Sequence, residues 1–227
     1  MDEILRTNCF RELDWQVAFA RIAMTDMRAA LTEIDQAARD FRSQREWFDV
    51  GSWTTLLGEF NRRRTAATRR FWYSAQAFLL AVSNVSRTLW PAEGHPKAGR
   101  NVPPSRGAEL RKHLGLAARS PLTDRAVRNH LEHFDEGLDL WAGGERKTQV
   151  FGDVGPTTQV ADLKNRLRDY DPITETLSFQ GERISLRELA DSLDDLARKL
   201  EAALNKTAAP DTHPLLSEPG NARFARM

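Results

Sequence analysis

The chain has 227 residues, of which 41% are hydrophobic and 29% are charged, as in a globular protein with one sizeable core. Its 33 basic residues nearly balance its 32 acidic ones, which excludes a global field that would steer it to nucleic acid or to an anionic membrane. A single cysteine, Cys9, excludes an internal disulfide, and the absence of a signal peptide pattern or long apolar run predicts a cytoplasmic protein with no membrane partner.

Two long helices are predicted within the first 90 residues. Residues 1–12 have the pattern of a short polar lead-in. Apolar residues then recur at steps of three and four over 13–41 and again over 57–89, which is typical of amphipathic helices. Turn residues lie between the two stripes in 47–53, and Pro91 ends the second. Two helices of similar length with a short connection form an antiparallel helical hairpin.

The remainder of the chain predicts further helices and a small β-hairpin. Residues 91–107 hold four prolines and three glycines, which indicates a loop, and a short helix at about 106–115 follows it. A third long helix is predicted over 122–141. Residues 173–179 alternate apolar and polar as a half-buried strand does, and Gln180-Gly181 turns the chain into a partner strand at 182–184.

A capping box, Ser185-Leu186-Arg187-Glu188, opens the last helix, which should end near residue 204. The fold class is therefore mostly α: a four- to five-helix bundle with a long N-terminal helical hairpin and a small β-hairpin before the last helix. Residues 1–205 form a single domain, and 206–227 have the composition of a disordered C-terminal tail. Within 143–171, a strand near 148–151 and a helix over 160–167 both remain open.

The predicted helix over 122–141 carries the candidate chemistry. Its apolar residues fall three or four apart and share one face: Val127, Leu131, Phe134, Leu138 and Trp141. Off that face lies Arg128-Asn129, followed after three residues by His133. This spacing resembles the catalytic motif of the HEPN superfamily, whose members are helical bundles. In that motif an Arg precedes a His by four to six intervening residues, and a polar residue, often Asn, follows the Arg.

The resemblance implies a metal-independent endoribonuclease of toxin or defence type, with an RNA substrate and an antitoxin partner. It implies a homodimer through the motif helix, in which two motifs build one composite site. His133 would act in general acid–base catalysis, Arg128 would hold the phosphate, and Asn129 would orient one of them or bond the substrate. Arg128 and His133 lie about 140° apart on an ideal helix, so a second surface must complete the site.

Five arginines on the second predicted helix are candidates for binding the RNA phosphates: Arg62, Arg63, Arg64, Arg69 and Arg70. Carboxylates crowd the motif helix, and these arginines could offset their repulsion of phosphate if the two helices lie side by side. The alternative is a solvated basic face that pairs with acidic residues inside the bundle.

Two other interpretations stay open. The first is a HEPN-like bundle without catalysis that serves as a dimerisation or ligand-binding module. The second is a metal centre, because His130, His133 and Glu136, with Glu132, could supply ligands from one helix face. The chain has no Glu-x-x-His pair of the kind that di-iron bundles use, so we expect no metal and no cofactor.

Overall fold

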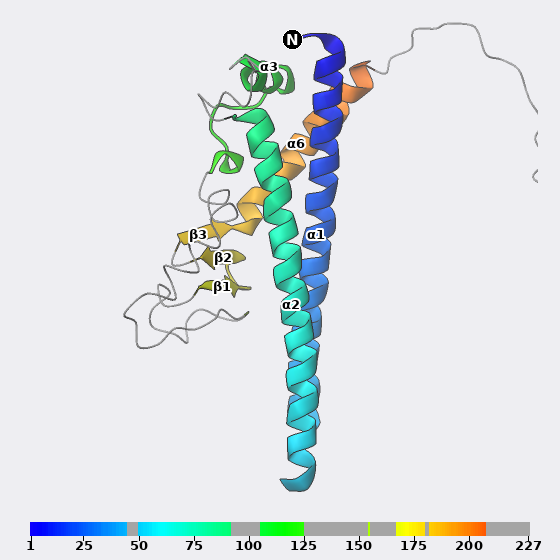
Figure 1. Cartoon of the computed structure of the whole chain (residues 1–227), viewed down its shortest axis with the longest axis vertical. Coiled ribbons are helices and arrows are strands. Elements are labelled where there is room, and N and C mark those ends of the chain that lie inside the picture. The colour runs from blue at the N-terminus through cyan, green and yellow to red at the C-terminus, as the bar shows by residue number, and fades with distance from the viewer. Residues whose placement is uncertain (45–49, 92–104, 125–153, 155–166, 180–181, 208–227) are drawn as a thin grey trace, which may run out of the picture.

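A computed structural model describes residues 1–44, 50–91, 105–124, 154, 167–179 and 182–207. Its main feature is an antiparallel hairpin of two helices, α1 (Glu3–Gln44) and α2 (Val50–Leu89), of 42 and 40 residues. The other described elements gather around one end of this hairpin, and its tip extends beyond them (Figure 1). The predicted mostly α fold, with a long N-terminal hairpin and a small sheet before the last helix, is confirmed.

The helix α1 starts ten residues earlier than its apolar stripe. The predicted polar lead-in over 1–12 is therefore wrong, since the helix begins at Glu3. The reason is local: the Asp2 carboxylate accepts hydrogen bonds from the backbone amides of Ile4 (2.7 Å) and Leu5 (3.4 Å), as an N-cap residue does. The apolar stripe begins to be buried at Phe10, so the first two turns are held by this cap and by neighbouring side chains.

In its second half, α2 is the central element of the bundle. Its buried residues cover a wide arc because α1, α3 and the sheet all pack on it: Phe71, Trp72, Ala75, Phe78, Leu79, Val82 and Val85. It ends at Leu89, just before Pro91, as predicted. The short helix α3 (Ser105–Leu114) returns to this end. Gly107 approaches it so closely that an added Cβ would lie 2.6 Å from the Leu89 carbonyl oxygen.

Three short strands form an antiparallel sheet in the order β1-β2-β3. They are β1 (Arg168–Asp171), β2 (Thr176–Phe179) and β3 (Glu182–Ser185). The predicted hairpin of β2 and β3 is confirmed, with Leu177 paired to Ile184. The predicted strand over 173–179 starts too early, because 172–175 form the turn between β1 and β2. The first strand was not predicted at all, since its sequence RDYD carries three charged residues.

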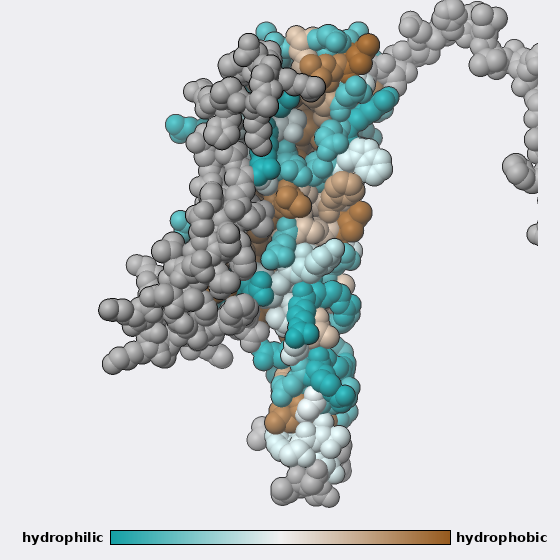
Figure 2. Space-filling model, viewed as in Figure 1, coloured by the Kyte–Doolittle hydropathy of each residue, from teal (hydrophilic) through white to brown (hydrophobic). Residues whose placement is uncertain are grey.

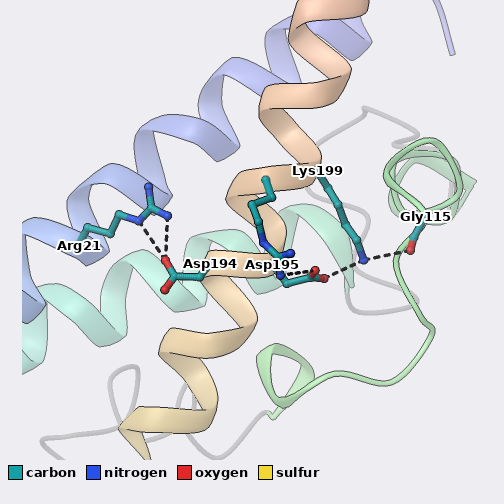
Figure 3. A network of polar contacts seen from close by, with 6 residues as sticks. Arg21, Gly115, Asp194, Asp195 and Lys199 are labelled. Atoms are coloured by element: carbon teal, nitrogen blue, oxygen red, sulfur yellow. Dashed lines mark hydrogen bonds and ion pairs between the residues drawn. The ribbon is translucent and has the colours of Figure 1, made fainter.

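The last helix, α6 (Leu186–Thr207), starts where the capping box predicts. The backbone amide of Glu188 donates to Ser185 Oγ at 3.2 Å. Figure 3 shows how polar contacts tie α6 to its neighbours. Asp194 accepts from Arg21 of α1 at 2.8 Å, and Lys199 donates to the Gly115 carbonyl at 3.2 Å. These contacts frame an apolar stripe that is buried against the hairpin: Leu186, Leu189, Leu193, Leu196 and Leu200.

A short 3₁₀ helix, η2 (Pro121–Thr123), joins the bundle between α2 and α6. Leu122 is its buried residue, and the Ser120 side chain accepts from the Leu122 amide at 3.2 Å. The predicted helix over 122–141 therefore does not begin at Leu122, because Pro121–Thr123 form a 3₁₀ turn and Asp124 is extended, and the rest of that helix lies outside the described residues. Among the described helices, no segment combines the length and the apolar character needed to cross a membrane.

Candidate functional site

The HEPN-like motif lies outside the described residues. Arg128, Asn129 and His133 all fall within 125–153, as do the alternative metal ligands of the same helix. The described chain stops short of them at Asp124, one residue after η2. The motif roles stay predictions, and so does the homodimer through this helix.

The five arginines proposed to bind phosphate lie on α2 but do not share one surface. Arg63 and Arg70, two turns apart, both turn toward α1. Arg63 pairs with Asp40 at 2.8 Å, and Arg70 donates to Glu33 at 2.9 Å. These two guanidinium groups thus join the two helices of the hairpin.

The other three arginines lie on other faces of α2. Arg62 and Arg69 are exposed and lie two turns apart on one face of α2, about 10 Å along the helix. Arg62 pairs with Glu59 in its own helix at 2.8 Å, and within the described ranges Arg69 has no ion-pair partner. Arg64 is half-buried on a third face. The cations that remain best placed for a phosphate are therefore Arg62 and Arg69.

A cavity of about 390 Å³ lies where α1, α6 and the β1–β2 turn meet. Its volume is in the range of sites that hold small molecules. Apolar side chains make up much of its wall: Met24, Met27, Leu31, Phe71, Tyr170 and Leu186. Charged side chains line it as well: Arg28, Glu175, Arg187, Asp191 and Asp194. Apolar and charged side chains thus share the wall of this cavity, which could hold a ligand that has both apolar and polar groups.

The charged groups of this cavity are only partly paired. Arg187 donates to Glu175 at 3.1 Å, and Asp194 is held by Arg21, which is seen beside it in Figure 3. In the described part of the chain, Arg28 and Asp191 have no ion-pair partner. Each could therefore contact a polar group of a bound molecule without giving up an internal bond.

Tyr170 and Glu175 are positioned by the strand and turn. Burial raises the pKa of Tyr170 to about 12, and the nearby carboxylates of Glu175 and Asp171 add to the rise, so its phenol stays a neutral hydrogen-bond donor. Glu175 has a left-handed backbone conformation, with φ of 51°, at the end of the turn. Its carbonyl accepts from the Leu186 amide at 2.9 Å, which fixes the turn against the start of α6.

A second cluster on β1 joins the sheet to α2. The Arg168 guanidinium lies 4.6 Å from the centre of the Trp72 ring, and burial lowers its pKa. The neighbouring Asp169 is 1% exposed. Trp72 in turn packs edge-on against Phe179 of β2, with ring centres 6.2 Å apart. This cluster is a packing contact with one half-buried cation.

The cavity is not evident from the amino-acid sequence. Arg28 looks like any solvated charge on a long helix, and Tyr170 lies in the strand that was not predicted. The turn signal Asp171-Pro172 was the one hint that the chain folds back here. Over the described ranges, no group of three or more potential ligands stands ready for a metal ion. Comparison with protein-family models, curated proteins and solved structures finds no match to this chain.

Proposed function

We propose that the chain is a HEPN-like endoribonuclease that needs no metal ion and works as a homodimer, as a toxin or a defence factor. One observation carries the proposal: Arg128-Asn129 and His133 have the spacing and the residue types of the HEPN motif. The mainly helical architecture agrees with what the resemblance implies. An antitoxin partner belongs to the same proposal.

The proposed chemistry is an internal displacement in RNA. The 2′-hydroxyl attacks the adjacent phosphorus, the bond to the 5′-oxygen of the next nucleotide breaks, and a 2′,3′-cyclic phosphate forms. His133 takes part in the proton transfers, because a histidine pKa lies near the working pH. Arg128 holds the phosphate and stabilises the charge that develops on it, and Asn129 orients the substrate or one of these side chains. A second motif helix supplies the groups that one helix cannot bring together.

The deciding experiment incubates RNA with the protein in EDTA. We expect wild type to cleave, and His133→Ala and Arg128→Ala each to lose at least about a hundredfold in rate. Losses of this size are usual for a general acid–base group such as His133 and for a group that stabilises transition-state charge such as Arg128. His113→Ala is the matched control, because His113 is exposed on α3 and 3.4 Å from Arg6, away from the motif in the chain. Equal cleavage by wild type and His133→Ala would remove His133 from the mechanism.

The phosphate-binding arginines allow a second test of the same proposal. Arg62→Ala with Arg69→Ala should weaken binding of a catalytically inactive protein to single-stranded RNA by roughly tenfold, with a shallower salt dependence. Arg63→Ala with Arg70→Ala is the matched control, because those two arginines reach across to α1 and bind Asp40 and Glu33, whereas Arg62 pairs only within α2. An equal loss in both pairs would show a general charge effect and not a phosphate track on α2.

The second candidate function is a HEPN-like module that binds a small molecule without catalysis, and the cavity favours it. Arg28, without an ion-pair partner in the described chain, lies beside an apolar wall, an arrangement that suits a carboxylate with a short apolar tail. Octanoate serves as the probe. Arg28→Ala should weaken its binding about tenfold in calorimetry. Arg39→Ala, an exposed arginine of the same helix paired with Asp35, should leave binding unchanged.

A further inference from the structure

The hairpin carries an uncovered apolar surface, which we call the apolar face. It is formed by residues at helical spacing on both helices: Trp15, Phe19 and Ile22 of α1, and Tyr73, Ala77 and Leu80 of α2. Trp15 and Ile22 are each 61% exposed, Tyr73 is 75% exposed and Leu80 is 53% exposed. Apolar side chains gather over α1 and α2 on the side that Figure 2 shows.

The two rows lie on the same side of the hairpin. Gln16 and Asn84, which join α1 to α2 through a hydrogen bond of 3.2 Å, each lie about one turn from a member of the face. The opposite side is occupied: Arg21 reaches Asp194 of α6, and α6 crosses behind the hairpin in the view of Figure 1. The apolar face is thus the outer surface of the hairpin, uncovered by any described element.

The size of this face points to a protein partner. Large aromatic side chains bury about 150–250 Å² each, so these residues together offer roughly 600 Å² of apolar surface. A patch of this size is at the upper end of what monomers expose, and such patches are often functional. Two such faces in contact bury roughly 1,200 Å², which reaches the range of stable protein interfaces. A second copy of the chain, packed through the same face, would therefore bury enough area for a stable interface.

We infer that two copies of this chain pack through their apolar faces into a four-helix bundle, with the two hairpins parallel. Charge decides the direction. Glu12 and Asp26 lie at the two ends of the face on α1, and Arg87 and Arg69 lie at the corresponding ends on α2. A two-fold axis along the hairpin sets α1 against the partner's α2. Glu12 then meets the partner's Arg87.

The antiparallel alternative is disfavoured by the same charges. A two-fold axis across the hairpin sets α1 against the partner's α1, so that Glu12 meets the partner's Asp26. It also sets Arg69 against the partner's Arg87. Like charges at both ends of an apolar contact weaken it, and opposite charges select the register. The inference stands on the hairpin alone and does not rest on RNA cleavage.

Sedimentation velocity of the full chain over a wide range of concentration tests the interface. This contact is separate from the one proposed through the motif helix, so the readout is the strength of self-association and not the presence of a dimer alone. We expect wild type to associate through this face, and Leu80→Lys should raise the dissociation constant at least about tenfold, because it places an ammonium in an apolar contact. Ile173→Lys is the matched control, since Ile173 is 73% exposed but lies on the β1–β2 turn. It should dimerise like wild type. Circular dichroism establishes that both variants fold.

Two results would overturn the inference: a wild-type monomer at every concentration, as when another segment of the chain covers the face, or a dimer unaffected by Leu80→Lys. A charge exchange tests the direction. Glu12→Arg and Arg87→Glu should each weaken the dimer by up to about fivefold, and the double variant should restore it. Tighter association of Glu12→Arg would establish the antiparallel arrangement instead. RNA cleavage measured on the same variants keeps a failure of the interface distinct from a failure of the nuclease.

Discussion

The two ends of the α1–α2 hairpin are held by different kinds of contact. Between Phe10 and Ala30, α1 packs within a bundle that includes α6, and the matching part of α2 also meets α3 and the sheet. Toward the tip, past Ala37 on α1 and before Ala67 on α2, no described side chain is buried. There the helices are joined by the Arg63–Asp40 ion pair and by the stacked rings of Phe41 and Phe60, whose centres lie 4.7 Å apart.

This difference follows from the number of neighbouring elements that pack against each stretch of the two helices. A helix that meets several neighbours buries side chains on a wide arc, and each large one that is fully buried contributes about 1.5–3 kcal/mol. A helix with one neighbour buries a narrow stripe, and exposed ion pairs contribute about 0.2–1 kcal/mol each. The bundle end should therefore hold most of the stability, and the tip should open locally at lower cost.

The largest expected loss of stability comes from removing a phenylalanine side chain at the bundle end, compared with removing one at the tip. Phe71→Ala should lower the free energy of unfolding by about 3–5 kcal/mol, because Phe71 is fully buried against Trp72 and Tyr170. Phe41→Ala should lower it by only about 1–2 kcal/mol, since that ring is half-exposed and the tip can relax. Urea denaturation measures both. Equal losses would mean that the tip is as tightly integrated as the bundle.

The sequence alone was sufficient to predict the helices and helix ends that depend on a local pattern of residues. Long stripes of apolar residues predicted both hairpin helices, Pro91 predicted the end of α2, and the capping box at Ser185 predicted the start of α6. The start of α1 was missed because a single cap, Asp2, extends the helix beyond its apolar stripe. The strand β1 was missed because Tyr170 is buried by α1 and α2, which lie far away in sequence.

The next largest changes in stability come from substituting two glycines, and they have opposite signs. Gly107→Ala should destabilise the protein by about 1–3 kcal/mol, because its Cβ would press on the Leu89 carbonyl and on Pro91 at the bundle end. Gly58→Ala, in the exposed part of α2 near the tip, should stabilise it by about 1 kcal/mol, because nothing lies within 4 Å and alanine favours the helix. Thermal unfolding measures the pair. A destabilised Gly58→Ala variant would contradict the open surroundings of that position.

The candidate sites were less predictable than the fold. Which arginines of α2 are bound to carboxylates depends on the register of the hairpin, and periodicity alone does not set that register. Arg63 and Arg70 meet Asp40 and Glu33 only because the two helices align in one particular way. The cavity joins residues that are more than a hundred positions apart, such as Arg28 and Glu175. The HEPN-like motif is the reverse case, a local pattern whose surroundings lie outside the described residues.

Ionisation of Tyr170 probes the bundle end. Its pKa is raised to about 12 by burial and by nearby carboxylates, whereas tyrosine in an unfolded chain ionises near 10. The folded state keeps this proton more tightly than the unfolded chain does. The neutral Tyr170 therefore contributes its full stabilisation below pH 10, and this contribution falls as the pH rises toward 12. Tyr73→Phe leaves Tyr170 as the chain's one tyrosine, and its ultraviolet absorbance should titrate near 12. A midpoint near 10 would show that the ring is open to water.

The smallest expected contribution to stability comes from the Arg63–Asp40 ion pair at the tip. The hydrogen bond from Arg63 is the first cause that holds the pKa of Asp40 below its ordinary value of 3.8, and a hydrogen bond from Gln36 adds to it. Because the folded-state pKa is lowered, the stabilisation is present above that ordinary value and is lost as the pH falls through the folded-state value. Carboxyl chemical shifts from NMR should show the Asp40 titration moving up toward 3.8 in Arg63→Ala.

Arg62→Ala is the control for that titration, because Arg62 pairs with Glu59 and not with Asp40. High salt should shrink the difference between wild type and Arg63→Ala, as expected for a pair that water surrounds. A salt-independent shift of the Asp40 pKa would instead mean that the tip shields this pair from solvent. The tip would then resemble the bundle end more than its lack of buried side chains suggests.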